Sequence, residues 1–189
     1  MKWIKLLLSL SLVTMFFGCI ISEEIETKIQ LNADGKTASA VIEYKNISSG
    51  EAEPADVQKD FNNLIEDWQG DQYLLDRAEE GLFIKNREVF IRDGKIVGRV
   101  TGIMKDVDKL YSFWVSHNER IMIFETESDN DYELVETNGK ILKTDKNTLI
   151  IWPDTASELR WQQRLTKLPG SFEKNQKPMV KILQDYLNK

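Results

Sequence analysis

The chain of 189 residues contains one cysteine, Cys19, and one histidine, His117. A single cysteine cannot form a disulfide within the chain, so the fold has to be held together by packing alone. The usual zinc sites need several Cys and His ligands, and a Ser–His–acid triad would have to use His117, which lies in a predicted loop. We therefore expect no disulfide, no metal and no cofactor, and we interpret His117 as an exposed loop residue.

Clustered positive charge is also absent from the sequence. There are 25 Lys and Arg residues against 31 Asp and Glu, a net charge of −6, and no run of five or more basic residues. Nucleic acids and anionic lipid surfaces attract clustered Lys and Arg, so we expect neither as a partner. Low-complexity tracts, repeats of fixed period and glycine-rich phosphate-binding motifs are missing as well.

One long uncharged stretch, residues 6–21, lies near the amino terminus. It follows Lys2 and Lys5 and ends before Glu23. A positive start followed by an apolar run is typical of a secretory signal. The run is 16 residues long, whereas a helix that crosses a bilayer needs about 20 apolar residues. The stretch therefore predicts a signal segment and is short for a permanent transmembrane helix.

The end of this run, Phe16-Phe17-Gly18-Cys19, resembles the lipobox of bacterial lipoproteins. In that family a leucine-like residue and two small residues precede the cysteine. Gly18 and Cys19 match the pattern, and Phe16 is a bulky apolar replacement for leucine. Phe17 departs from the pattern, because the family has a small residue at that position.

The resemblance implies that residues 1–18 are a signal peptide and that residues 19–189 are a single lipid-anchored domain, with diacylglycerol on the Cys19 thiol and an acyl group such as palmitate on its amine. Several acyl chains hold a protein firmly on a membrane, whereas one holds it marginally. The chain would then lie in the bacterial cell envelope and face the periplasm or the exterior. Ile20 and Ile21 lack the aspartate that retains enteric lipoproteins in the inner membrane, which favours the outer membrane. The alternative is that Cys19 is an ordinary apolar residue of an uncleaved anchor helix.

The first half of the remaining chain predicts a hairpin, a helix and further strands. Apolar residues alternate over residues 24–46 around a turn at Asp34-Gly35, which predicts two paired strands. The apolar spacing over residues 54–68 predicts an amphipathic helix. From residue 72 the period returns to two, and residues 81–104 predict three short strands that turn at residues 85–87 and 93–94. Gly98 and Gly102 indicate a bulge or a close crossing.

The second half predicts strands followed by a helix. Residues 105–119 suit either a short helical turn or a loop with aromatic side chains, and residues 120–127 predict a strand. Asn138-Gly139, between two alternating runs, is the strongest hairpin signal in the chain, and another turn follows at residues 145–147. Residues 157–168 suit a strand or a helix, and we favour a strand. A helix, with its start at Pro178, is predicted for the tail.

These elements predict an α+β fold. We expect an antiparallel meander sheet of eight or nine strands built from hairpins, with one early helix and one C-terminal helix packed on one side of it.

Aromatic residues provide the candidate binding site. Phe113 and Trp114, together with Trp152 and Trp161, could line a ligand pocket or an interaction surface, and the alternative is ordinary core packing. Paired carboxylates recur, but in a chain with 31 acidic residues such pairs are expected by chance. The acidic stretch 129–133 fails the EF-hand pattern, because Leu134 and Lys140 stand where a glycine and a carboxylate ligand would be needed.

No catalytic constellation is visible in the sequence, so an enzyme is the least expected class. The leading hypothesis is an envelope lipoprotein whose domain is a non-enzymatic interaction or structural module, held at the membrane by its N-terminal lipid anchor and contacting an envelope protein partner. The alternative is a small-molecule or peptide-binding lipoprotein with an aromatic-lined pocket near Phe113 and Trp114.

Overall fold

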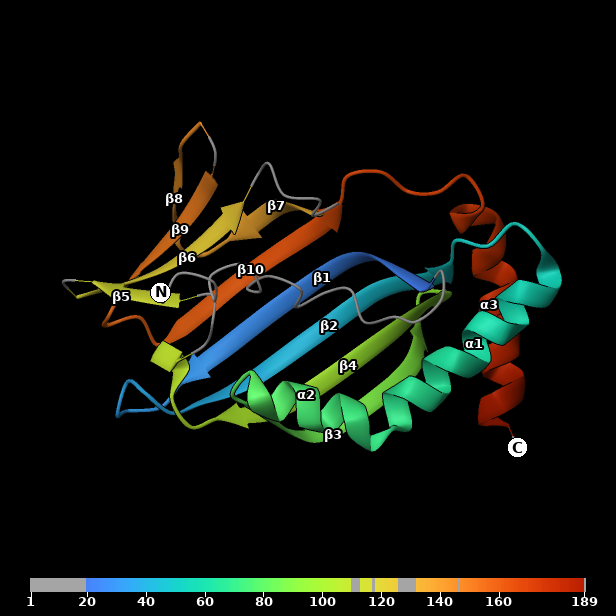
Figure 1. Cartoon of the computed structure of the whole chain (residues 1–189), viewed down its shortest axis with the longest axis horizontal. Helices are drawn as coiled ribbons and strands as arrows, with labels where there is room; N and C mark the ends of the chain where they lie inside the picture. Colours follow the sequence, from blue (N-terminus) through green and yellow to red (C-terminus); the bar gives the residue numbers. More distant parts are fainter. Residues whose placement is uncertain (1–19, 110–112, 117, 126–131, 146, 189) are drawn as a thin grey trace, which may run out of the picture.

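The computed structural model describes residues 20–109, 113–116, 118–125, 132–145 and 147–188 (Figure 1). Within these ranges it has three α-helices, one short 3₁₀ helix and ten strands in two antiparallel sheets. The predicted α+β class is therefore confirmed. Cys19, His117 and Asp129 lie outside the described residues.

The predicted first hairpin is confirmed as β1 (Ile20–Leu31) and β2 (Ala38–Ser49). Ile25 and Ile29 on β1 are buried, whereas Lys28 and Gln30 between and beyond them are exposed, as period-two alternation requires. The Asp34 carboxylate accepts hydrogen bonds from the backbone N–H groups of Lys36 and Thr37, both at 2.8 Å. These bonds hold the turn and lower the pKa of Asp34.

The predicted early helix is α1 (Pro54–Gln69), which buries its apolar stripe at Val57, Phe61, Leu64 and Trp68. A second helix, α2 (Asp71–Glu79), follows directly after Gly70. The period-two interpretation of the chain after residue 72 is therefore wrong over α2. A nine-residue segment with one half-buried face is too short for periodicity to separate a helix from a strand.

The C-terminal helix is α3 (Phe172–Leu187), and it begins six residues before Pro178, where the sequence placed its start. Pro178 lies inside the helix and cannot donate a hydrogen bond to the turn before it. Tertiary contacts compensate, because Phe172 and Met179 are fully buried and Asn175 Nδ2 donates to the carbonyl oxygens of Ser49 and Glu51. Pro178 predicted the start of the helix, but the packing of Phe172 and Asn175 extends the helix toward its N-terminal side.

The large sheet has the strand order β3-β4-β2-β1-β10-β7. Its further strands are β3 (Leu82–Arg92), β4 (Lys95–Met104), β7 (Tyr132–Thr137) and β10 (Glu158–Leu165). β10 confirms the strand favoured for residues 157–168. The prediction of three strands over residues 81–104 is wrong, because the expected turn at residues 85–87 is a register shift between Ile84 and Asn86 within a single strand.

Glycines in β4 let other elements approach closely, as predicted. A Cβ atom on Gly98 would lie 2.8 Å from Trp68 Cη2 of α1, and one on Gly102 would lie 2.7 Å from Leu82 Cδ1 of β3. Neither space admits a side chain. These two residues therefore set how near α1 and β3 come to the centre of the sheet.

The small sheet has the strand order β5-β6-β9-β8. Its strands are β5 (Phe113–Ser116), β6 (Glu119–Glu125), β8 (Lys140–Lys143) and β9 (Asn147–Pro153), and the 3₁₀ helix η1 (Val107–Lys109) precedes β5. The hairpin predicted at Asn138-Gly139 is wrong. β7 pairs with β10 in the large sheet, whereas β8 pairs with β9 in the small one, so this dipeptide is the corner between the two sheets.

The helices and the small sheet leave one face of the large sheet open. On the other face, α3 and the start of α1 lie at one end, α2 packs along β3, and the small sheet lies at the opposite end (Figure 1). The open face carries cross-strand ion pairs, among them Lys28–Glu158 at 2.8 Å and Arg160–Glu136 at 2.7 Å. One face is therefore dry and apolar and the other is charged, which is the expected division for an antiparallel sheet.

Candidate functional site: the outer face of the small sheet

Phe113 and Trp114, the aromatic pair singled out in the sequence, lie next to each other on β5 and point to opposite faces of the small sheet. The Phe113 side chain is 6% exposed and the Trp114 side chain is 68% exposed. The structure therefore does not bring the two rings together in one cavity. Ligand binding by this pair stays a prediction.

Phe113 belongs to an aromatic cluster between the two sheets. Its ring centroid lies 5.9 Å from that of Trp152 on β9 and 6.2 Å from that of Trp161 on β10, and the two tryptophans lie 6.1 Å apart. All three side chains are buried. These tilted and edge-on contacts are typical of core aromatic packing and hold the inner face of the small sheet on the large one.

Trp114 belongs to the opposite face of the small sheet, which is apolar across all four strands. In the strand register Trp114 is opposite Ile121, which is opposite Ile151. A neighbouring row runs through Ile123, Leu149 and Leu142. We call these six side chains the outer apolar face: Trp114, Ile121, Ile123, Leu142, Leu149 and Ile151.

The composition of β6 and β9 accounts for two apolar faces. In β9 the buried residues Ile150 and Trp152 alternate with half-buried Leu149 and Ile151, so apolar side chains point both ways. Continuous apolar runs of this kind are typical of strands covered on both faces, whereas a sheet with one wet face alternates apolar with polar residues. Sequence reasoning identified these strands but missed this signal.

Exposed apolar side chains gather around the small sheet. On the outer apolar face, Trp114 is 68% exposed and Leu142 on the edge strand β8 is 47% exposed, whereas Ile121, Ile123, Leu149 and Ile151 are half-buried. Scattered apolar residues are common on protein surfaces, but a contiguous patch marks an interaction site. The outer apolar face is such a patch.

Two oppositely charged residues border this face. Lys140 on β8 is opposite Ile151 in the register, and Glu119 on β6 is two residues from Ile121, so both point outward with the apolar rows. Both are exposed. Arg120, between them in the sheet, points inward and is buried. Its Nε donates to Asp108 Oδ1 at 2.8 Å and its Nη1 donates to the Asp154 carbonyl at 3.0 Å. Arg120 therefore stabilises the interior and is not part of the outer apolar face.

The paired carboxylates noted in the sequence are placed on helices and loops away from this face. Burial raises the pKa of Asp67 on α1, and the charge of Glu66 raises it further. Burial also raises the pKa of Glu80, against the charge of Arg77, which donates to it at 2.7 Å. Among the described residues no group of three or more His, Cys, Asp or Glu side chains could hold a metal ion.

No helix in the described ranges has the length and apolar character needed to cross a bilayer. Comparisons with protein-family models, with curated proteins and with solved structures found no match.

Proposed function

We propose that the chain is an envelope lipoprotein, acylated at Cys19, whose folded part is a non-enzymatic interaction module that associates through the outer apolar face. The observation that carries the proposal is this in-register apolar surface with Trp114 at its edge. Removing a large apolar side chain from water contributes about 1.5–3 kcal/mol. Trp114 and Leu142 are exposed and the other four side chains of the face are half-buried, so association can still remove apolar area from water.

The position of the anchor supports the same proposal. β1 begins at Ile20, directly after Cys19, so there is no linker between the proposed lipid and the sheet. Ile20 pairs with Ser49 at the end of the sheet where α1 and α3 lie, whereas the small sheet lies at the other end (Figure 1). The 12 residues of β1 span about 40 Å at roughly 3.3 Å per residue. A lipid at Cys19 would therefore present the outer apolar face away from the membrane.

We infer that the occupant of this face is a second copy of the same chain. Two sheets pack face to face with their strands nearly aligned, and most homodimers use a two-fold axis. If the two small sheets face each other across a two-fold axis parallel to their strands, β5 of one copy lies over β8 of the other. This arrangement brings Lys140 of each copy toward Glu119 of its partner, which adds charge complementarity to apolar burial.

The proposal predicts a dimer that depends on Trp114. The full chain in detergent should sediment as a dimer, and Trp114→Glu should shift it to a monomer because a carboxylate would be buried without a partner. Leu75→Glu on α2 is the matched control, since Leu75 is 58% exposed and lies away from the small sheet. A dimer that persists in Trp114→Glu, or a wild-type chain that is monomeric at all concentrations, would contradict the proposal.

A further inference from the structure

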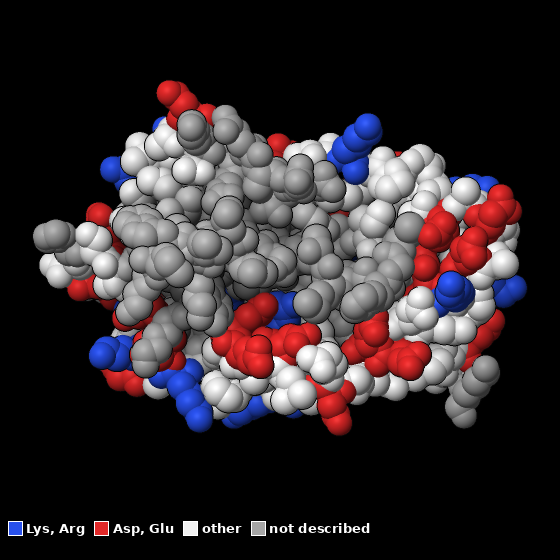
Figure 2. Space-filling view, in the orientation of Figure 1, with Lys and Arg blue, Asp and Glu red and all other residues white. Residues whose placement is uncertain are grey.

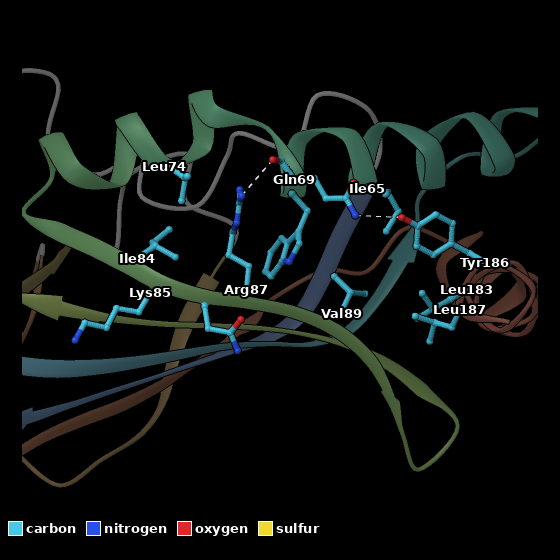
Figure 3. A pocket seen from close by; sticks show the side chains of 12 residues that line it. Ile65, Gln69, Leu74, Ile84, Lys85, Arg87, Val89, Leu183, Tyr186 and Leu187 are labelled. Atoms are coloured by element: carbon cyan, nitrogen blue, oxygen red, sulfur yellow. Dashed lines mark hydrogen bonds between the residues drawn. The ribbon is translucent and has the colours of Figure 1, made fainter. Parts of the chain in front are cut away.

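A groove of about 460 Å³ lies between α1, α2, β3 and the end of α3 (Figure 3). The fold itself engages its arginine, because Arg87 Nη1 and Nη2 donate to the carbonyl oxygens of Gly70 and Gln69 at 3.0 and 3.1 Å. Acidic side chains gather near the start of α1 (Figure 2). Neither feature specifies a ligand, and the chemically reactive position of the chain lies at the corner between the two sheets.

This corner contains Asn138-Gly139, the only Asn-Gly dipeptide in the sequence. The backbone nitrogen of the residue after an asparagine can attack the carbon of the side-chain amide. A glycine at that position leaves the nitrogen least hindered, because it has no side chain. Asn138 is exposed, so water reaches it. The corner therefore combines a dipeptide prone to deamidation with access to the solvent that completes the reaction.

The folded corner holds both reacting groups in other bonds. The Gly139 N–H donates to Thr137 Oγ1 at 3.0 Å, which stabilises the nitrogen with its proton attached. Asn138 Nδ2 donates to the Glu158 carbonyl at 3.0 Å, and Asn138 Oδ1 accepts two further bonds from β9 and β10. The reaction needs a deprotonated nitrogen and an amide that is free to turn, and these four bonds oppose both.

The neighbouring structure keeps the corner in place. Thr137 Oγ1 itself donates to the Arg160 carbonyl of β10 at 2.6 Å. β7, before the corner, pairs with β10, and β8, after the corner, pairs with β9. The hydrogen bonds at Asn138 and Gly139 are therefore released when the small sheet separates locally from the large one.

We propose that Asn138 is a deamidation site that is protected in the folded chain and becomes reactive when the corner between the sheets opens. The Gly139 nitrogen bonds to Cγ of Asn138, and the side-chain nitrogen leaves as ammonia with the proton that the Gly139 nitrogen gives up. Water then opens the resulting succinimide. Attack at the side-chain carbonyl gives aspartate, and attack at the backbone carbonyl gives isoaspartate, whose backbone runs through Cβ.

Either product hinders the corner from closing again. In aspartate a carboxylate oxygen replaces Nδ2 and faces the Glu158 carbonyl, so a donor becomes a second acceptor. In isoaspartate the backbone gains an atom in a tight space, where a Cβ on Gly139 would already lie 2.8 Å from Trp152 Nε1. Deamidation thus converts a transient opening of the corner into a lasting one.

The test follows deamidation of the full chain in detergent at mildly alkaline pH, with and without guanidinium chloride. Mass spectrometry of peptides that contain residues 137–140 measures aspartate and isoaspartate. We expect the folded chain to react at least about tenfold more slowly than the unfolded chain, because the corner has to open first. In guanidinium chloride Asn138 should react before every other asparagine. The deamidated chain should also unfold at a lower temperature than the unmodified chain.

A matched pair of variants tests the role of the corner bonds. Thr137→Val removes the acceptor of the Gly139 N–H and should raise the folded-state rate about fivefold, while the rate in guanidinium chloride stays the same. Thr137→Ser keeps the hydroxyl and should react like the wild type.

Three results would overturn the proposal. They are equal rates in the folded and unfolded wild type, a folded-state rate that Thr137→Val leaves unchanged, and an unfolded chain that deamidates first at another asparagine. None of these outcomes bears on the dimer.

Discussion

Asn138 and Gly139 join the two sheets through two different properties. Asn138 Oδ1 accepts hydrogen bonds from Trp152 Nε1 at 2.7 Å and from the Arg160 backbone N–H at 2.9 Å, so one side chain ties β9 to β10. Gly139 allows close contact, since a Cβ atom there would lie 2.6 Å from Ile150 Cγ2. The corner therefore requires the amide side chain of Asn138 and, at the next position, a glycine.

Gly139→Ala should destabilise the fold because it forces atoms into the packed contact with Ile150 and Trp152. Overpacking of this kind costs about 1–3 kcal/mol. Chemical denaturation of the full chain in detergent would measure the loss. Gly94→Ser serves as a comparison, because Gly94 has open space around it and a φ of +74°. Its substitution would therefore lower stability through backbone strain alone, without overpacking. An unchanged free energy of unfolding in Gly139→Ala would contradict the close packing.

The same dipeptide shows what local sequence signals leave open. Asn-Gly between two alternating runs predicted a hairpin, because that dipeptide suits a two-residue turn. The runs on either side are strands, as predicted, but each finds a different partner: β10 for β7 and β9 for β8. β8 pairs with the next strand in the chain, whereas β7 pairs with a strand that lies beyond both β8 and β9 in the sequence. Turn chemistry alone could not reveal the corner.

Among the elements, β2, β3 and β4 are linked on the charged open face through Glu43 of β2, which bonds to Arg92 of β3 and Arg99 of β4. Glu43 accepts hydrogen bonds from Arg92 Nη2 at 2.7 Å and from Arg99 Nε at 2.8 Å. Burial alone would raise the pKa of Glu43, but the bonds from both guanidinium groups outweigh it and hold the pKa below its usual value of 4.5.

This lowered pKa predicts a pH-dependent contribution to stability. A carboxyl whose pKa is lower in the folded state stabilises the fold above about pH 4.5, and the contribution is lost as the pH falls through the folded-state value. Glu43→Gln should therefore cost on the order of 1 kcal/mol at pH 7 and less at pH 3. Denaturation of both proteins at the two pH values measures this difference. An equal cost at both would argue against the ion-pair network.

Helices and strands differed in how well the sequence revealed them. The long first hairpin and α1 were predicted within a few residues because each repeats its apolar period several times. The helix α2 was missed because it has only nine residues, and the start of α3 was misplaced because packing of Phe172 and Asn175 extends the helix past the local proline signal. Of the candidate site, the sequence identified Trp114 but could not show that Phe113 faces the core.

At the scale of the whole molecule, the proposed lipid at Cys19 and the outer apolar face lie at opposite ends of the large sheet. The lipid anchor predicts that Cys19→Ala abolishes incorporation of labelled palmitate and releases the chain from the membrane fraction. Metabolic labelling with fractionation measures both effects. Label incorporation that is unchanged by Cys19→Ala would count against acylation at this residue.

The central claim is that two copies meet through the outer apolar face, and a charge exchange across the two-fold axis tests it most directly. Sedimentation velocity of the full chain in detergent would compare wild type, Lys140→Glu, Glu119→Lys and the double variant. Each single change places like charges together across the axis and should weaken dimerisation, whereas the double variant restores opposite charges and should return the dimer. If the double variant dissociates as far as the single ones do, or if neither single change has an effect, the proposed dimer is wrong.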